Sequence, residues 1–293
     1  MSSSQQKTCL MCGRCPTAIN QLRRCGSCLA VKYCSSACQT EDWASHRLVC
    51  ENVGAARKEE LMPLMDAAHN GDVATVKKLL KSGAKVDGGV FSCDETPLLI
   101  TPLLVAARAG HAAVIAVLLE AGAKMNRTTT GGFTPLLLAT QEGHRAAVLV
   151  LIGAGAQIDT VHDKHCTPLF IAAQGGHEGV LAVLIKAGGD VNRTRDNGIS
   201  PVFVAAQKNH RAVLEMLIEA GADISSRRDN DGCTPLIIAA MNGHEAVVVA
   251  LLKAGAQMTA TDDGHTPLMA ATSGGHTSVV AALRRWTAAG IRS

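Results

Sequence analysis

Aromatic residues are scarce in this chain: only 2% of its 293 residues are Phe, Trp or Tyr, although 47% are hydrophobic. A core with so few rings has to be built from Ala, Leu, Val and Ile, which is typical of packed short helices and argues against a large β-sandwich. The sequence also lacks any uninterrupted apolar run of about 18 residues, the length that crosses a membrane, and an apolar signal segment at its start, MSSSQQKTCL. We therefore expect an intracellular protein of the cytoplasm, the nucleus or both.

Neither sign of charge dominates the chain. The formal charge is +3, but the first 60 residues carry eight Lys or Arg against five Asp or Glu, and the other 233 residues carry twenty of each. If seven thiolates and one neutral histidine of the first segment bind two Zn²⁺, its charge changes by 4 − 7 = −3 and the protein becomes formally neutral. A strongly basic surface for nucleic acid is therefore not expected.

Cysteine is concentrated at one end, with eight of the eleven between residues 9 and 50. In a reducing compartment such clusters are more often metal ligands than disulfides. Eight ligands fill two closed tetrahedral zinc sites, which is the mark of structural rather than catalytic zinc. The ligand spacing is Cys9-x2-Cys12, x12, Cys25-x2-Cys28, x5, Cys34-x3-Cys38, x7, His46-x3-Cys50. Within each of the last two pairs, the two ligands are four positions apart, so both members of a pair can lie on one face of a helix.

The end of this segment, Tyr-Cys-x3-Cys-Gln-x3-Trp-x2-His-x3-Cys, resembles the MYND zinc finger, and the match extends over residues 9–50. The resemblance implies that the ligand pairs alternate between two zinc ions. One zinc would be bound by Cys9, Cys12, Cys34 and Cys38, and the other by Cys25, Cys28, His46 and Cys50. Cys15 leaves an alternative open, because Cys12-x2-Cys15 could serve as the first pair.

Other uses of the cysteines fit less well. A RING finger has its histidine in the middle and ends in Cys-x2-Cys, whereas the final pair here is His-x3-Cys. A Cys2His2 DNA finger needs two histidines and a basic recognition helix, and SSACQTEDWASH contains no Lys or Arg. A thioredoxin-like CxxC needs a βαβ context, which is absent. A segment so small and polar is not expected to fold without metal.

The MYND resemblance also implies a shallow groove for short proline-containing peptides. The residues that match this groove are Tyr33, Ser36, Gln39 and Trp43. Trp43 would offer an apolar platform to proline rings, while Ser36 and Gln39 could hydrogen-bond an extended backbone. The alternative is that Tyr33 and Trp43 simply form the small core of the finger, and the two roles can coexist.

From residue 61 onward the sequence repeats itself. Related segments, such as TPLLVAARAGHAAVIAVLLEAGAKMN, start at Thr101, Thr134, Thr167, Ser200, Thr234 and Thr266. They resemble ankyrin repeats: Thr-Pro starts a first helix, Gly-His breaks the chain, and an apolar second helix ends at Gly-Ala. The resemblance implies a mostly α solenoid of helix-turn-helix repeats with short β-hairpin loops. The His of the family's Thr-Pro-Leu-His is missing from each of these copies, so we expect apolar packing in its place.

The two ends of the array differ from its middle. A more polar copy from Met62, MPLMDAAHNGDVATVKKLLKSGAKVD, resembles an N-terminal cap, and Arg284 stands where the other copies have Leu or Ile. We predict about seven repeats over residues 61–293, after a disordered segment 1–8, the finger and a polar linker 51–60 that could be helical. Before the second repeat, Thr96-Pro97 and Thr101-Pro102 both offer a helix start. The later start would loop out about five extra residues, either as a binding feature or as a tolerated insertion.

Six histidines recur just after the helical break, at His111, His144, His177, His210, His244 and His276. Neighbouring repeats lie about 10 Å apart, which is too far for shared metal coordination at about 2 Å. We therefore expect these histidines to join adjacent loops by hydrogen bonds. The scattered Cys93, Cys166 and Cys233 are expected to be small loop or core residues rather than nucleophiles.

Binding residues of ankyrin arrays lie on the loop tips and on the exposed inner side of the first helices. The matching positions here are Arg108, Gln141, Glu142, Asp163, Lys164, Gln174, Arg195, Asp196, Gln207, Lys208, Asn230, Met241, Asn242, Asp262 and Asp263. This mixture of charges and amides can bind a folded protein but offers neither a basic stripe nor stacking aromatics for nucleic acid. A merely solvated face is the alternative.

No catalytic constellation is present: the chain lacks a Gly-rich phosphate loop, a SET region such as sometimes accompanies a MYND finger, and the Asp-His-His-Cys core of ankyrin-containing palmitoyltransferases. We therefore predict a non-enzymatic adaptor or scaffold that binds proteins through both modules, with no small-molecule substrate and no membrane contact. The alternative is an accessory subunit that recruits a chromatin-modifying or ubiquitin-ligase complex. Nucleic-acid binding is the least favoured hypothesis.

Overall fold

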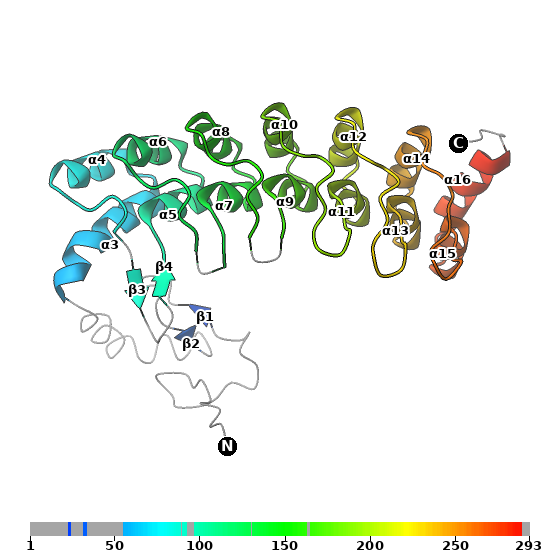
Figure 1. Ribbon diagram of the computed structural model, residues 1–293, viewed down its shortest axis with the longest axis horizontal. Helices are drawn as coiled ribbons and strands as arrows, with labels where there is room; N and C mark the ends of the chain where they lie inside the picture. The colour runs from blue at the N-terminus through cyan, green and yellow to red at the C-terminus, as the bar shows by residue number, and fades with distance from the viewer. Residues whose placement is uncertain are drawn as a thin grey trace, which may run out of the picture.

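The computed structural model describes residues 23–24, 32–33, 55–88, 90–92, 97–129, 131–162 and 165–288. Within these ranges the chain forms fourteen helices and two antiparallel strand pairs. The helices stack as repeated pairs into one elongated solenoid with two rows (Figure 1). This architecture is the mostly α ankyrin solenoid that the sequence predicts.

The first helix of each repeat lies in one row and the second helix in the other (Figure 1). The first helices are α3 (Ala55–Asn70), α5 (Pro102–Ala109), α7 (Pro135–Gln141), α9 (Pro168–Gly175), α11 (Pro201–Gln207), α13 (Pro235–Met241) and α15 (Pro267–Ser273). The second helices are α4 (Val73–Lys81), α6 (Ala112–Glu120), α8 (Arg145–Gly153), α10 (Glu178–Lys186), α12 (Arg211–Glu219), α14 (Glu245–Lys253) and α16 (Thr277–Ala288). The connecting loops project from the first-helix row, on the side away from the second helices.

The Thr-Pro pair starts the first helices as the sequence predicts. In α5 the hydroxyl of Thr101 accepts a hydrogen bond from the backbone nitrogen of Leu104 at 3.3 Å, and Pro102 occupies the first turn, where no N–H partner is needed. The same cap is made by Thr134, Thr167, Ser200, Thr234 and Thr266. One local signal therefore defines the start of six successive first helices.

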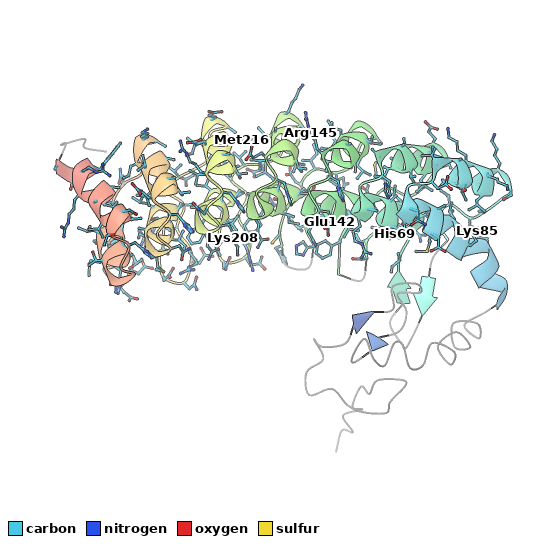
Figure 2. The ribbon with its side chains drawn as sticks, turned by 180° about the vertical axis from the view of Figure 1, so that it is seen from behind. His69, Lys85, Glu142, Arg145, Lys208 and Met216 are labelled. Carbon is cyan, nitrogen blue, oxygen red and sulfur yellow. The ribbon has the colours of Figure 1, made fainter. Side chains whose placement is uncertain are left out.

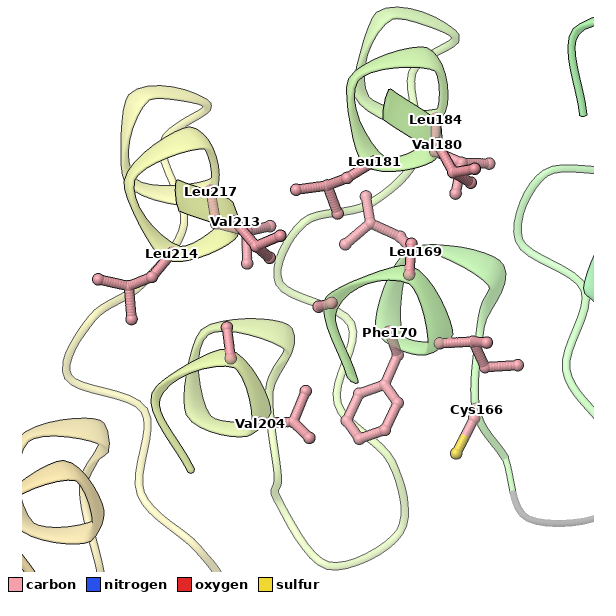
Figure 3. Close-up of a cluster of buried hydrophobic side chains, with 14 of the residues drawn as sticks. Cys166, Leu169, Phe170, Val180, Leu181, Leu184, Val204, Val213, Leu214 and Leu217 are labelled. Atoms are coloured by element: carbon pink, nitrogen blue, oxygen red, sulfur yellow. The ribbon is translucent and has the colours of Figure 1, made fainter. Parts of the chain in front are cut away.

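The core is a continuous layer of aliphatic side chains between the two rows. Figure 3 shows one part of it, made by Leu169 and Phe170 of α9, Val180, Leu181 and Leu184 of α10, Val204 of α11, and Val213, Leu214 and Leu217 of α12. Phe170 and Phe203 occupy the position of the missing family histidine, and each is only 1% exposed. Apolar packing has replaced that histidine, as predicted.

The N-terminal cap is longer than the repeat pattern indicates. Helix α3 begins at Ala55, inside the predicted linker 51–60, and runs through Pro63 to Asn70. At the other end Arg284 is exposed, whereas Leu252, its counterpart in α14, is buried. However, Met269 on α15 is 49% exposed, so the end of the last described repeat is polar on its second helix but not on its first.

The insertion before the second repeat forms a hairpin. Strand β3 (Val90–Ser92) pairs with β4 (Pro97–Leu99) in antiparallel register, with Phe91 opposite Leu98. Pro97 therefore lies in a strand, and the helix starts at Pro102. Of the two possible starts, the helix uses Thr101-Pro102, because residues 97–99 are paired in the hairpin and cannot begin a helix. Among the described residues, no helix has the length and apolar character needed to cross a membrane.

Candidate binding surfaces

The predicted zinc ligands all lie outside the described residues, as do Ser36, Gln39, Trp43 and the side chain of Tyr33. What is described of this segment is the backbone of β1 (Arg23–Arg24) and β2 (Lys32–Tyr33), which pair in antiparallel register with Arg23 opposite Tyr33. Cys25 and Cys28 fall between these two strands in the sequence. The donor set of seven thiols and one imidazole suits tetrahedral zinc.

The repeated histidines form a ladder of hydrogen bonds between neighbouring repeats. The Nε2 atom of His144 lies 3.0 Å from the carbonyl oxygen of Arg108, and that of His177 lies 3.0 Å from the carbonyl oxygen of Gln141. The equivalent bonds join His111 to His69, His210 to Gln174, His244 to Gln207 and His276 to Met241 at 2.8–3.2 Å. This histidine ladder confirms that these side chains join adjacent repeats, and the described residues contain no cluster of three or more His, Cys, Asp or Glu that could hold a metal.

A close contact with glycine accompanies most of these bonds. Gly143 has a φ of +75°, and a Cβ built on it would stand 2.7 Å from Nδ1 of His177. The same arrangement holds at Gly71, Gly110, Gly176 and Gly243. Asn209 is the exception: it takes the glycine's place with a φ of 62°. A side chain at these glycines would therefore meet both a left-handed backbone and the histidine ring of the next repeat.

The predicted ankyrin-face residues lie mainly on the surface that the ladder supports. Exposed side chains are those of Arg108, Gln141, Glu142, Gln174, Asp196, Lys208, Asn230, Met241, Asn242, Asp262 and Asp263. Gln207 and Arg195 are half-buried, and Asp163 and Lys164 lie outside the described residues. Figure 2 places Glu142 and Lys208 along the first-helix row and Arg145 and Met216 on the second-helix row. The structure thus brings one end of each first helix into a common surface.

In five of these face residues, the backbone carbonyl oxygen is hydrogen-bonded to a histidine of the ladder. They are Arg108, Gln141, Gln174, Gln207 and Met241. Their backbone is therefore fixed relative to the next repeat while most of their side chains remain exposed. Such pre-organisation lowers the entropy lost when a partner binds.

The loop tips toward the C-terminal side are also tied together. The backbone nitrogen of Asp229 donates to the carbonyl oxygen of Asn197 at 3.1 Å, and that of Asp262 donates to the carbonyl oxygen of Asp231 at 3.0 Å. Arg227 bridges two loops, with hydrogen bonds of 2.6 Å to the Asp262 carboxylate and 3.2 Å to the Ala260 carbonyl oxygen. Arg227 is not among the face residues predicted from the sequence. The acidic residues that stand one repeat further along, such as Asp262, were the signal that could have indicated it.

Ion pairing reduces the free charge of these tips. Arg228 forms an ion pair with Asp231, whose pKa is lowered chiefly by the hydrogen bond from this guanidinium. The same guanidinium carbon lies 5.6 Å from the centre of the Phe203 ring, a cation–π distance. His165, held at a φ of 55°, lies 3.2 Å from the Asp196 carboxylate. The loop tips therefore present a mixed polar surface rather than a field of one sign.

Comparison with known proteins identifies both parts of the chain. The family model described as "Ankyrin repeats (3 copies)" matches residues 35–129, 64–162, 155–228 and 225–289, and the model described as "MYND finger" matches residues 8–50. The crystal structure of the human ASB11 ankyrin repeat domain superposes with a TM-score of 0.68 at 28% identity, covering 76% of this chain and 97% of that one.

Shorter similarities are found to three larger proteins. The chain is 33% identical over 52 residues to SET domain and MYND-type zinc finger protein 6 of Schizosaccharomyces pombe and 43% identical over 49 residues to ubiquitin carboxyl-terminal hydrolase 19 of Arabidopsis thaliana. It is 36% identical over 42 residues to SET domain-containing protein 14 of Caenorhabditis elegans. These matches cover 18%, 16% and 14% of this chain but only 11%, 6% and 10% of the relatives.

Both modules are of kinds that mediate protein–protein interaction, and a MYND finger implies bound zinc. With repeats matched across residues 35–289 and stacked in the structure as a solenoid, the chain belongs to the ankyrin-repeat family and carries a MYND zinc finger at residues 8–50.

Proposed function

We propose that this protein is a non-enzymatic adaptor that binds two protein targets, a folded partner on the ankyrin face and a proline-containing peptide on the MYND finger. The observation that carries the proposal is the coincidence of the histidine ladder with the face. The backbone of Arg108, Gln141, Gln174, Gln207 and Met241 is held by the next repeat, so their side chains are presented in register, one from each repeat. A rigid row of this kind is suited to reading a folded surface.

The ankyrin half of the proposal is tested by affinity capture with the full chain, followed by mass spectrometry. The face variant Gln174→Ala with Lys208→Glu changes two exposed side chains without touching the histidine bonds, because those use backbone carbonyl oxygens. Lys186→Glu, on the second-helix row, is the matched control. Partners lost by the face variant and kept by the control support the proposal, and an unchanged set of partners contradicts it.

The finger half is tested with zinc and peptide together. Native mass spectrometry should find two zinc ions per chain, which is the number that eight ligands in two tetrahedral sites require. A proline-rich peptide titrated into the labelled protein should shift finger resonances, and Trp43→Ala should abolish binding while keeping both zinc ions. If Trp43→Ala keeps the zinc and the affinity, the groove is not the binding site.

A second candidate function is recruitment of a larger enzyme, with this chain as an accessory subunit. It is favoured by the names of the relatives, two of which carry a SET domain and one of which is a ubiquitin carboxyl-terminal hydrolase. In those proteins the matched segment is a small part of the chain. Capture from both cytoplasmic and nuclear extracts, the two compartments in which we place the protein, separates the candidates. Stoichiometric co-purification of a methyltransferase or ubiquitin ligase supports recruitment, and diverse partners with proline-rich segments support the adaptor.

A further inference from the structure

The outer surface of three second helices contains an apolar patch that neither proposed binding site uses. It is formed by Ala113 and Ala116 of α6, Ala146 and Leu149 of α8, and Gly179 and Ala182 of α10. The two residues from each helix are three apart, so they lie on one face, and α8 packs against both α6 and α10. We call these six residues the second-helix patch. Leu149 is its centre and is 49% exposed, although it lies in the middle of a nine-residue helix.

The repeat register shows that this patch is local. On α4 the residue in the register of Leu149 is Lys77, and on α12 it is Glu215, which forms an ion pair with Arg211 at 2.8 Å. The surface is therefore charged on both sides of the patch, as a solvated helical face normally is. A single exposed leucine is ordinary, but a contiguous apolar area across three helices marks an interaction site on a soluble domain.

The small residues give the patch a shallow, accessible shape. Gly179 leaves room for the side chain of Arg145, whose Cδ would lie 3.2 Å from a Cβ at that position, so this arginine reaches from α8 over α10. Its stem thereby borders the patch while its charge remains exposed. Alanine on the neighbouring helices lets another backbone approach closely, with Leu149 standing above the surface to enter between the side chains of a partner.

The charged residues around the patch indicate which way round a partner would bind. Helix α4, next to the patch on its N-terminal side, exposes Lys77, Lys78 and Lys81 and contains no acidic residue. The acids nearest the patch, Glu120 and Glu178, stand at the end of α6 and the start of α10. A partner with acidic residues at one end and apolar residues along one face is therefore complementary to the surface as a whole.

We propose that the second-helix patch docks an amphipathic helix of a partner protein, with its apolar stripe on Leu149 and an acidic end over the lysines of α4. Repeats spaced about 10 Å apart place α4 and α10 about 30 Å apart, a distance that a helix of about 20 residues spans at 1.5 Å per residue. Recognition of an apolar stripe on one helical face follows the general mode of helix-in-groove binding. This site lies on the second-helix row, so it would leave the ankyrin face free for its own partner (Figure 2).

The experiment selects helices directly rather than waiting for a natural partner. A displayed library of helical peptides of about 20 residues, randomised on one face and at both ends, is selected against the full chain and counter-selected against Leu149→Glu. Leu149 is 49% exposed and does not belong to the buried core, so the fold should tolerate this change, and folding of the variant is checked by circular dichroism. The matched control is Ala281→Glu, an exposed residue in the same register on α16.

We expect selected peptides to share an apolar stripe with acidic residues enriched at one end. Leu149→Glu should weaken their binding at least about tenfold, because the apolar contact between Leu149 and the bound peptide is lost and a charge is placed in the interface. Ala281→Glu should leave binding unchanged, and Lys77→Glu with Lys78→Glu should weaken it severalfold at low salt. If no selected peptide distinguishes Leu149→Glu from the wild type, or acidic ends are not enriched, the proposal is wrong. Self-association that Leu149→Glu abolishes would instead assign the patch to a second copy of this chain.

Discussion

The Nε2 atom of His144 lies 3.0 Å from the carbonyl oxygen of Arg108, a residue 36 positions earlier in the chain. This bond joins the start of α8 to the end of α5 in the repeat before it. In a solenoid each repeat contacts only its neighbours, so such bonds are part of the interface energy that keeps the array together. The same atom pair recurs along the array, which makes one member of the ladder a fair test of the rest.

We expect His144→Ala to lower the free energy of unfolding by about 1 kcal/mol, the usual net contribution of one hydrogen bond. The loss is measured by urea denaturation followed by far-UV circular dichroism. His265→Ala is the control, because His265 is an exposed loop residue outside the ladder. Equal stabilities for the two variants would mean that the ladder contributes nothing.

A second prediction separates backbone strain from steric contact at the helical break. Gly143 and Gly122 both have positive φ, +75° and +86°, but a Cβ at Gly143 would stand 2.7 Å from His177 and one at Gly122 meets nothing within 4 Å. Both alanine variants should lose about 1 kcal/mol from the left-handed backbone. Gly143→Ala should lose a further amount by displacing the His177 ring. Thermal unfolding of the two variants should therefore differ, and equal losses would rule out a role for the close contact.

Much of the solenoid can be predicted from the sequence because its signals are local and repeated. Each Thr-Pro pair, from Thr101-Pro102 onward, is by itself a sufficient signal for a helix start. The regular spacing of the histidines predicts the hydrogen bonds between repeats. The start of α3 at Ala55 could not be placed in the same way, because ENVGAARKEE has no capping residue of that kind. The hairpin β3–β4 could not be predicted either, since two Thr-Pro pairs offer a helix start and only tertiary packing decides between them.

The surface was harder to predict than the core. Register correctly placed most of the ankyrin-face residues in the open, but it could not reveal that Arg227 bridges to Asp262, because that pairing depends on how two loops lie against each other. Nor did it reveal the exposure of Leu149, since an apolar residue in a second helix is normally counted as core. Its place, three residues after Ala146, puts it on the outer face, and only the stacked helices show that nothing described covers it there.

A third prediction concerns a buried hydroxyl. The Oγ1 atom of Thr140 has no hydrogen-bond partner in the described structure, and the residue is fully buried. Five other repeats have alanine in this register, at positions 68, 107, 173, 206 and 240. An unsatisfied hydroxyl costs about 1–3 kcal/mol, which exceeds the contribution of one methyl group. Thr140→Ala should therefore stabilise the protein, by up to about 1 kcal/mol.

The control for Thr140 is Thr272→Ala, in the same register on α15. Thr272 is exposed, and its hydroxyl donates to the carbonyl oxygen of Leu268 at 2.7 Å. Its replacement should change the free energy of unfolding by no more than about 0.5 kcal/mol, as is usual at exposed positions. The contrast is measured by urea denaturation of both variants beside the wild type. A destabilised Thr140→Ala would indicate that its hydroxyl does have a partner, such as a buried water.

A fourth prediction concerns the reactivity of Cys233, which is 1% exposed. Burial raises the pKa of its thiol from 9.0 to about 11, with Arg228 acting in the opposite direction. At pH 8 the thiolate fraction then falls from about one tenth to about one thousandth, and only the thiolate is alkylated. Iodoacetamide should therefore label Cys233 at least about 100-fold more slowly in the folded chain than in urea. The rate is followed by mass spectrometry of the Cys233 peptide, and equal rates in the two states would contradict a buried thiol.

The same pKa shift predicts how stability depends on pH. Because the folded thiol has the higher pKa, the folded state holds its proton longer than the unfolded state does. This advantage is complete below pH 9, the unfolded pKa, and is lost as the pH rises toward about 11, where the folded thiol also ionises. Other groups titrate in this range, so the comparison is between the wild type and Cys233→Ala at pH 8 and pH 10.5. The wild type should lose more stability across this interval, since the variant has no thiol whose ionisation favours unfolding.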